Sequence, residues 1–510
     1  MKKSRLFVTN TLLLTATAFI IRAVGVAYNV YITGLVGERG VGIFQLVMSV
    51  YGFALTLATS GVNLAATRLC AEAQTHDEER AAMRGAFLYA SLFGGGAAAL
   101  LFLLADPIGR YLLADEASVI SLRALSLSLP AISMGSALAG YFNARRAAVK
   151  SASAQLFEQA VRIFACIMLL KLLLPRGDMY ACFAMTAGGA ISEWMSFLYS
   201  FALYRWEQRK KRGNTSGRKM KELCAIAIPV ALSAYARSAL VCVEHLLIPY
   251  GLAKSGLGKD GALASYGVFH GMVMPLVTLP MALLSSMASL LVPELAGLNA
   301  AEDSEGMVKA AKRACGFALI FGVGCAGVMM TFAGELGELL YNSADAGKYI
   351  RIMAPLIPIM YVDHIVDSML KGADLQLQSM RINIADSMLC VLLIYLLLPK
   401  YGIMGYAAVL YISEMINASL SITVLTGKIP FEKGMPWALI RSLLAVVGAA
   451  CATRLIFSSG VILVMGRGLS LVLNILCCVF FYLLLIAALR VPESMSLPLP
   501  RITLKKRASV

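Results

Sequence analysis

Long apolar segments, separated by short polar ones, follow each other along almost the whole chain. Each is long enough to cross the roughly 30 Å hydrocarbon layer of a membrane as a helix. We predict fourteen such helices, at residues 7–33, 43–69, 85–105, 119–141, 153–174, 179–204, 223–250, 264–292, 313–334, 349–371, 379–399, 404–426, 435–459 and 469–491. The rest of the chain leaves no room for a soluble domain, so the pattern predicts an all-α integral membrane protein.

The second half of the chain repeats the first. Leu172-Leu-Leu-Pro175 and Ile191-Ser-Glu193 recur as Leu396-Leu-Leu-Pro399 and Ile412-Ser-Glu414. We therefore predict two six-helix lobes followed by a C-terminal helix pair. Because each lobe has an even number of helices, both enter the membrane from the same side, and their pseudo-twofold axis runs along the membrane normal. The predicted domains are an N-terminal lobe at 1–204, a basic cytoplasmic linker at 205–222, a C-terminal lobe at 223–426, and a part at 427–510 that holds the helix pair and a basic tail.

Composition supports the membrane assignment. The 510 residues are 59% hydrophobic and only 15% charged, and the mean hydropathy is +0.76. This leaves too little polar surface for a soluble globule. The apolar run after Met1-Lys-Lys-Ser-Arg5 is too long for a signal peptide and carries Arg22, so we interpret it as the first spanning helix.

The net charge of +16 is informative mainly through its placement. With the N-terminus inside, about 30 of the 45 lysines and arginines fall on the cytoplasmic side, on one set of loops, on the adjoining helix ends and on the two termini. This set comprises the loops at 70–84, 142–152, 205–222, 293–312, 372–378 and 427–434. The positive-inside rule then predicts a multi-pass protein of the plasma membrane with both termini in the cytoplasm. Since the charges are explained by topology, nothing indicates a nucleic-acid partner.

Two arginines lie inside predicted spans, where a charge is costly and tends to face water or a protein interior. Arg22 lies past the middle of segment 7–33, and Arg237 lies midway along segment 223–250. One arginine per lobe at similar depth predicts two cations facing a central cavity, where guanidinium groups can bind a phosphate bidentately. In the structural alternative, both arginines hydrogen-bond helix carbonyls.

Several acids inside spans are candidates for binding a coupling cation or a proton. Glu158 and Arg162 are spaced i,i+4, which also permits a structural ion pair. Asp363 and Asp367 share a helix face, where a surface pair between Lys371 and Asp367 is the alternative. The remaining candidates are Asp386 and the repeated acids Glu193 and Glu414, whose recurrence also fits a packing role.

No catalytic motif is present, and the acids are scattered over separate spans, so the sequence predicts a protein that is not an enzyme. The eleven cysteines have no metal-ligand spacing, and no nucleotide-binding glycine motif follows a strand. We therefore expect no metal and no cofactor. His245 and His270 are interpreted as hydrogen-bonded interior residues without a functional role.

Several passages resemble stage V sporulation protein B-like membrane proteins, in the polysaccharide-transporter branch of the MOP (multidrug/oligosaccharidyl-lipid/polysaccharide) exporter superfamily. The similar passages are Arg22-Ala-Val-Gly-Val26, Gly40–Gly52, Leu57-Ala-Thr-Ser-Gly-Val62, Gln155–Arg162, Ala227-Ile-Pro-Val230 and Leu290–Glu294. The resemblance covers nearly the whole chain. It implies two six-helix lobes around a central cavity and alternating access for lipid-linked glycan precursors. Related peptidoglycan-precursor flippases have an Arg-Asp pair where this chain has Tyr28 and Asn29, so a sporulation or surface-polysaccharide relative fits better.

The leading hypothesis is a flippase or exporter for a lipid-linked oligosaccharide or another cell-envelope polysaccharide precursor, in sporulation or cell-wall synthesis. Its partners would be a polyprenyl-pyrophosphate-linked glycan held by Arg22 and Arg237, the membrane lipids, and a coupling cation or proton. Two alternatives stay open. One is a cation-coupled multidrug exporter of the same fold, and the other is a non-transporting scaffold of envelope assembly.

Overall fold

The computed structural model describes residues 2–113, 115–145, 147–176, 179–209, 220–429, 435–458, 467–489 and 491. These residues are almost entirely helical, and no strand occurs among them. Within the described ranges, nine helices are long and apolar enough to cross a membrane, or ten if one bent pair counts as a single span. The prediction of an all-helical, multi-pass membrane protein is confirmed. The predicted C-terminal tail and most of the predicted linker lie outside the described residues.

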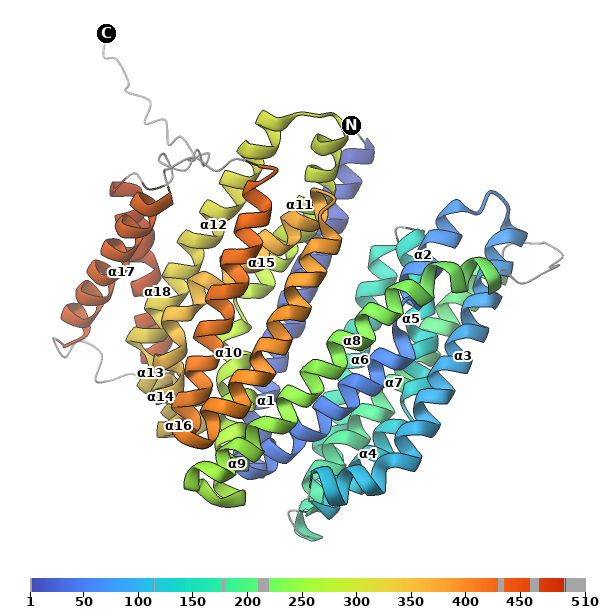
Figure 1. Cartoon of the computed structure of the whole chain (residues 1–510), viewed down its shortest axis with the longest axis horizontal. Coiled ribbons are helices and arrows are strands. Elements are labelled where there is room, and N and C mark those ends of the chain that lie inside the picture. Colours follow the sequence, from blue (N-terminus) through green and yellow to red (C-terminus); the bar gives the residue numbers. More distant parts are fainter. Residues whose placement is uncertain are drawn as a thin grey trace. The chain divides into compact units, whose positions relative to one another are not determined.

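The chain forms two compact units, which are described separately. The first consists of Met1–Ala282 and Asn383–Leu410, and the second of Leu283–Ile382 and Tyr411–Val510. Helices of the first unit (Figure 1) are α1 (Lys2–Thr59), α2 (Val62–Glu72), α3 (His76–Pro107), α4 (Glu116–Ser126), α5 (Leu129–Ala144), α6 (Ala148–Leu173), α7 (Met179–Arg209), α8 (Met220–Leu252), α9 (Gly258–Tyr266) and α10 (Met274–Thr278). Its short π and 3-10 segments are η1 (Ile108–Leu112), η2 (Leu174–Arg176), η3 (Ala253–Leu257) and η4 (Gly267–Val273).

Most of the later helices belong to the second unit. They are α11 (Met281–Ala300), α12 (Ser304–Thr331), α13 (Ala333–Tyr341), α14 (Ala344–Met353), η5 (Ala354–Leu356), α15 (Ile357–Gly372), α17 (Met435–Ser458) and α18 (Arg467–Ala488). Helix α16 (Gln376–Thr426) contributes residues 383–410 to the first unit and its two ends to the second.

Two glycines divide the longest helices. Gly37 in α1 has φ 75° and Gly402 in α16 has φ 56°, a left-handed conformation that glycine adopts without a Cβ clash. Each break separates two of the predicted spans, so α1 and α16 each contribute two. With these divisions, the described residues include a helix at each of the fourteen predicted positions.

Two predicted helices are less regular than expected. The segment predicted at 119–141 consists of α4 and α5, which meet at an angle of 41°. Pro130 at the start of α5 has no N–H to continue the helix ladder, which accounts for the bend. The segment predicted at 43–69 is interrupted at Gly61, where φ is 79° and a Cβ would overlap the carbonyl oxygen of Ala227. The interruption therefore permits the backbone of α8 to approach closely.

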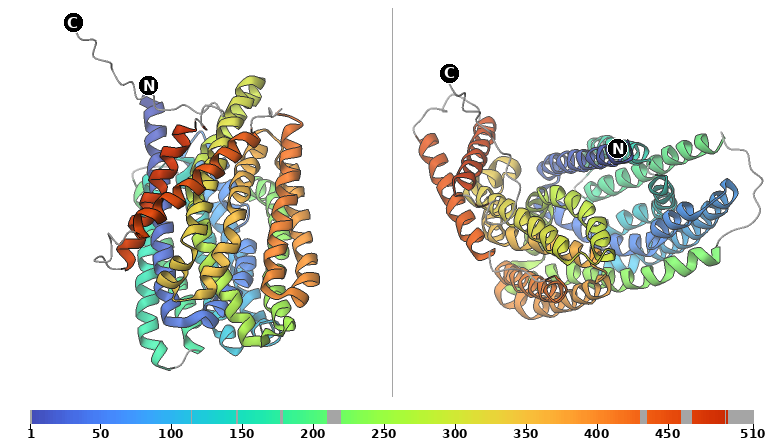
Figure 2. Two further views of the ribbon diagram at one scale, coloured as in Figure 1. Left: turned by 90° about the vertical axis from the view of Figure 1, so that its left-hand side faces the viewer. Right: turned by 90° about the horizontal axis from the view of Figure 1, so that it is seen from above.

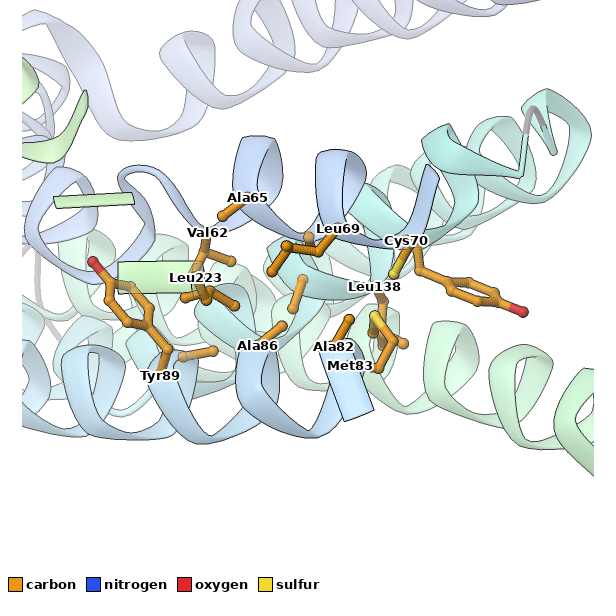
Figure 3. Close-up of a cluster of buried hydrophobic side chains, with 14 of the residues drawn as sticks. Val62, Ala65, Leu69, Cys70, Ala82, Met83, Ala86, Tyr89, Leu138 and Leu223 are labelled. Carbon is orange, nitrogen blue, oxygen red and sulfur yellow. The ribbon is translucent and has the colours of Figure 1, made fainter. Parts of the chain in front are cut away.

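A core of small and medium-sized side chains holds α2, α3, α5 and α8 together (Figure 3). Val62, Met83, Leu138 and Leu223 come from these four helices in turn, and each is fully buried. Alanines between them bring the helix backbones near one another. In a membrane such close packing provides much of the attraction between helices, because lipid tails are as apolar as the core.

Replacing Gly140 by valine is expected to destabilise this core. A Cβ at this position of α5 would lie 2.6 Å from the carbonyl oxygen of Asn63 and 2.9 Å from Cβ of Ala66. Overpacking of this kind costs about 1–3 kcal/mol, so the apparent melting temperature of the purified protein should fall. Gly135→Val on the same helix is the control, since a Cβ added there would have no atom within 4 Å. Equal melting temperatures of the two variants would contradict the packing described here.

In the second unit, α17 and α18 lie side by side as the final helix pair (Figure 2). The hydroxyl of Tyr482 in α18 donates a hydrogen bond of 2.7 Å to the carbonyl oxygen of Ile320 in α12. Gly324, one turn further along α12, leaves room for the same tyrosine ring, because a Cβ there would lie 2.5 Å from it. Helix α12 therefore anchors the C-terminal pair within its unit.

Candidate functional site

The first unit contains a cavity of about 770 Å³, lined mainly by α1, α6 and α7 and completed by residues of α4, α5, η4 and α10. Most of its lining is apolar, with a small number of polar side chains, which is typical of small-molecule sites. The charged residues in the lining are Arg22, Arg162 and Glu193. We refer to this space as the cationic cavity.

Arg22 extends its guanidinium from α1 to α10. It donates a hydrogen bond of 2.8 Å to Oγ1 of Thr278, whose hydroxyl in turn donates to the carbonyl oxygen of Met274 at 2.8 Å. Among the described residues Arg22 has no carboxylate partner. Its positive charge is therefore uncompensated at the cavity wall, where it is available to an anionic ligand.

Arg162 lies in a different environment, between two acids. It donates hydrogen bonds of 2.7 Å to Glu158 on its own helix and 2.8 Å to Glu193 on α7. The intrahelical pair with Glu158 was expected from the i,i+4 spacing, and Glu193 joins it through the packing of α6 against α7. The hydroxyl of Ser196 donates to the second oxygen of Glu158 at 3.2 Å. The positive charge of Arg162 is thus balanced within this cluster.

Arg237, the predicted second cation, occupies an exposed position on α8. It is absent from the described residues that line the cationic cavity. The structure therefore brings Arg22 together with Arg162, and a joint role of Arg22 and Arg237 stays a prediction.

The other predicted acids lie outside this lining. In the second unit, Asp363 is 9% exposed and accepts a hydrogen bond of 3.0 Å from Asn417, and Asp367 pairs with Lys371 at 2.5 Å. This i,i+4 pair matches the structural alternative considered for Asp367. Glu414 lies in the part of α16 that belongs to the second unit, and Asp386 lies in the part that belongs to the first.

Sequence reasoning missed several polar residues of the cationic cavity. Asn29, Gln45 and Gln159 all line it, and the side-chain amide of Asn29 donates to the carbonyl oxygen of Gly271. A signal was available for Gln159, which lies three residues before Arg162 and therefore near it on one face of the helix. The other two positions could not be identified without knowing which helices pack together.

Two histidines that were interpreted separately from the sequence are neighbours in the structure. The rings of His245 and His270 have centroids 4.8 Å apart. A hydrogen bond of 2.9 Å joins His245 to Tyr266, and another of 2.9 Å joins His270 to Tyr406. Of these four, His270 lines the cationic cavity. Within the described part of the chain, no group of three His, Cys, Asp or Glu side chains is arranged to hold a metal ion.

The fold and the cavity define a helical membrane transporter, and comparison with known families specifies which kind. The family "Polysaccharide biosynthesis protein" matches residues 7–298, and the MatE family matches residues 252–396. The first match covers more than half of the chain, so the chain belongs to the polysaccharide biosynthesis protein family, within the MOP superfamily of membrane flippases and exporters.

Similarities to individual proteins support this assignment. Stage V sporulation protein B of Bacillus subtilis (strain 168) is 25% identical over 437 residues, which make up 83% of this chain and 84% of that protein. An inward-facing multidrug resistance MATE family transporter of the MOP superfamily has a TM-score of 0.67 at 14% identity, covering 82% of this chain and 98% of its own. The lipid II flippase MurJ, in an inward closed conformation, has a TM-score of 0.66 at 12% identity, covering 95% and 98%. The predicted two-lobe transporter fold is confirmed, and the predicted domain boundaries stay a prediction.

Proposed function

We propose that this protein is a flippase for a lipid-linked glycan precursor of the cell envelope. Family membership and the similarity to stage V sporulation protein B and to MurJ support this class of substrate. The observation that carries the proposal is the position of Arg22, a cation without a carboxylate partner among the described residues, at the wall of a cavity of about 770 Å³. Such a site favours a substrate with a negative charge.

In the proposed cycle, the pyrophosphate of the substrate binds in the cationic cavity while the polyprenyl chain stays in the bilayer. A guanidinium can hold two phosphate oxygens at once, and a cavity with little water strengthens this contact. The cavity then opens alternately to the two sides of the plasma membrane. No covalent step is required, since a difference in affinity between two conformations is sufficient, and we therefore propose a transporter rather than an enzyme.

The acids have a separate role in this proposal. Glu158 and Glu193 hold the guanidinium of Arg162 in place, so that the cavity wall retains a fixed shape while Arg22 binds the anion. We retain Arg237 as a second phosphate ligand in another conformation of the cycle. Asp363, Asp367, Asp386 and Glu414 remain candidates for binding a coupling cation or proton, with membrane potential as the other source of energy.

A cation-coupled multidrug exporter is the second candidate function, favoured by the MatE match and by the carboxylates of Glu158 and Glu193 near the cavity. A cationic drug would require an acid that is not already held by another side chain. Both of these acids instead hydrogen-bond Arg162. A flippase with an anionic substrate therefore agrees better with the charged side chains of the cationic cavity than a multidrug exporter does. Orientation with both termini in the cytoplasm is part of the proposal, and a non-transporting scaffold is the third possibility.

Depleting the protein from its native cells should raise lipid-linked glycan intermediates in the inner leaflet severalfold, because their exit is blocked. The measurement is extraction and mass spectrometry of these lipids, with wild-type protein re-expressed as the control. Unchanged intermediates accompanied by altered drug efflux would instead identify the multidrug exporter. A depletion phenotype that Arg22→Gln and Arg237→Gln both rescue fully would favour the scaffold.

A further inference from the structure

A second cavity, of about 340 Å³, adjoins the cationic cavity in the first unit. The two share Leu55, Ile132 and Glu193 in their linings. The second cavity is lined by α1, α2, α5, α6 and α7. We refer to it as the polar chamber.

Each of three helices passes from one cavity to the other along a single face. On α6, Arg162 and Gln159 line the cationic cavity, whereas Glu158, Gln155 and Ser151 line the polar chamber. On α7 the cationic cavity is lined by Thr186 and Gly189 and the polar chamber by Ser196 and Ser200, with Glu193 between them. On α1, Tyr51 lies on the first side and Thr59 on the second. On all three helices, residues toward one end line the cationic cavity and residues toward the other end line the polar chamber.

The polar chamber is rich in neutral hydroxyl and amide groups. They are provided by Asn63, Ser136, Ser151, Gln155, Ser196 and Ser200. Gln155 is exposed, and among the described residues its side-chain amide has no hydrogen-bond partner. The amide of Asn63 makes only a long contact, 3.3 Å, to the carbonyl oxygen of Ser136. These groups can therefore donate to, and accept from, a ligand.

The two acids of the chamber, Glu158 and Glu193, are both held by Arg162. Arg162 hydrogen-bonds one oxygen of Glu158 and one oxygen of Glu193, at 2.7 and 2.8 Å. Paired in this way, the carboxylates can still accept hydrogen bonds from hydroxyl groups, as Glu158 does from Ser196 at 3.2 Å. A ligand with many hydroxyl groups and an uncharged amide fits this lining.

We propose that the polar chamber binds the first sugar of the substrate, while the cationic cavity binds the pyrophosphate to which that sugar is attached. This inference rests on the proposed function and assigns the saccharide to a separate subsite. The volume is at the lower end of the range for small-molecule sites, about 300–1,000 Å³, which suits one sugar unit better than an extended glycan. The continuity of the two linings through Glu193 matches the covalent link between sugar and pyrophosphate.

The test compares two probes, a polyprenyl pyrophosphate carrying one N-acetylglucosamine and the same lipid without the sugar. Binding of each to the purified full-length protein in nanodiscs is measured by microscale thermophoresis. We expect wild-type protein to bind the sugar-bearing lipid more tightly. Gln155→Leu combined with Ser200→Ala should weaken binding of that lipid about tenfold, the effect of losing one or two neutral hydrogen bonds, and leave binding of the sugarless lipid unchanged. Gln378→Leu, an exposed position on α16, is the matched control.

Arg22→Gln separates this inference from the proposed function, because it should weaken binding of both lipids by the same factor. If wild-type protein bound both lipids equally, or if the double variant lost affinity for both in parallel, the sugar subsite would be refuted and the flippase proposal retained. If wild-type protein bound neither lipid, the proposed function itself would fail and the subsite with it.

Discussion

Replacing Arg22 by glutamine should lower the rate of precursor flipping by about 100-fold, since it removes the proposed bidentate, charge-assisted contact to phosphate. Glutamine keeps a donor for the hydrogen bond to Thr278, which in the native protein measures 2.8 Å, so the helix packing should remain intact. Arg22→Lys should lose about tenfold, because lysine keeps the charge and loses the planar fork. The measurement is the translocation of a labelled polyprenyl-pyrophosphate-linked sugar in proteoliposomes.

Two further arginine variants test whether the loss of flipping is specific to Arg22. Arg110→Gln, at an exposed position in η1, changes the net charge equally and should flip at the wild-type rate. Arg237→Gln tests the second predicted phosphate ligand, and a loss comparable to that of Arg22→Gln would support a two-arginine site. Wild-type flipping by Arg22→Gln would contradict the site assignment, even if the protein proved to be a flippase.

Replacing Arg145 by alanine should clearly destabilise the first unit. Arg145, at the end of α5, holds the carboxylate of Glu79 in the first turn of α3, with Nε 2.7 Å from Oε1 and a second hydrogen bond to Oε2. The Glu79 side chain is only 2% exposed, whereas that of Arg145 is 36% exposed. Removing the arginine leaves a buried charge without its bidentate partner, at a cost of about 3 kcal/mol. The hydrogen bond to Glu79 raises the pKa of the Arg145 guanidinium.

The loss should be visible as a fall of several degrees in the apparent melting temperature, measured by size-exclusion chromatography after heating. Arg68→Ala is the matched control, because its ion pair with Glu72 is exposed on both sides and such pairs contribute about 0–1 kcal/mol. In the double variant Glu79→Gln, Arg145→Ala, stability should partly return, since glutamine carries no charge into the buried site. Equal melting temperatures for Arg145→Ala and Arg68→Ala would show that the pair is not a structural anchor.

Much of the fold could be predicted from the chain alone. Apolar segments long enough to span a membrane are a local property, and the structure contains a helical span at each predicted position. The repeat around Glu193 and Glu414 indicated two copies of one bundle, in agreement with the two-lobe fold of the similar transporters. The departures from the prediction occur at Pro130 and Gly61, where one residue changes the backbone. A proline and a glycine at these positions indicated that the helix would break. They did not indicate the angle of the break or the helix that packs against it.

For the site, the sequence by itself determined which charges lie within the membrane-spanning helices, because a charge in an apolar segment is visible without any knowledge of packing. Arg22 was identified in this way, and the spacing of Glu158 and Arg162 was sufficient to predict their pair. Only the tertiary structure decided that Glu193 completes the Arg162 cluster, that Arg237 lies outside the cavity lining, and that Gln155 lines a separate polar chamber. These relations join α1, α6 and α7, and a helix's own sequence sets the face on which a residue lies but not the helix that packs against it.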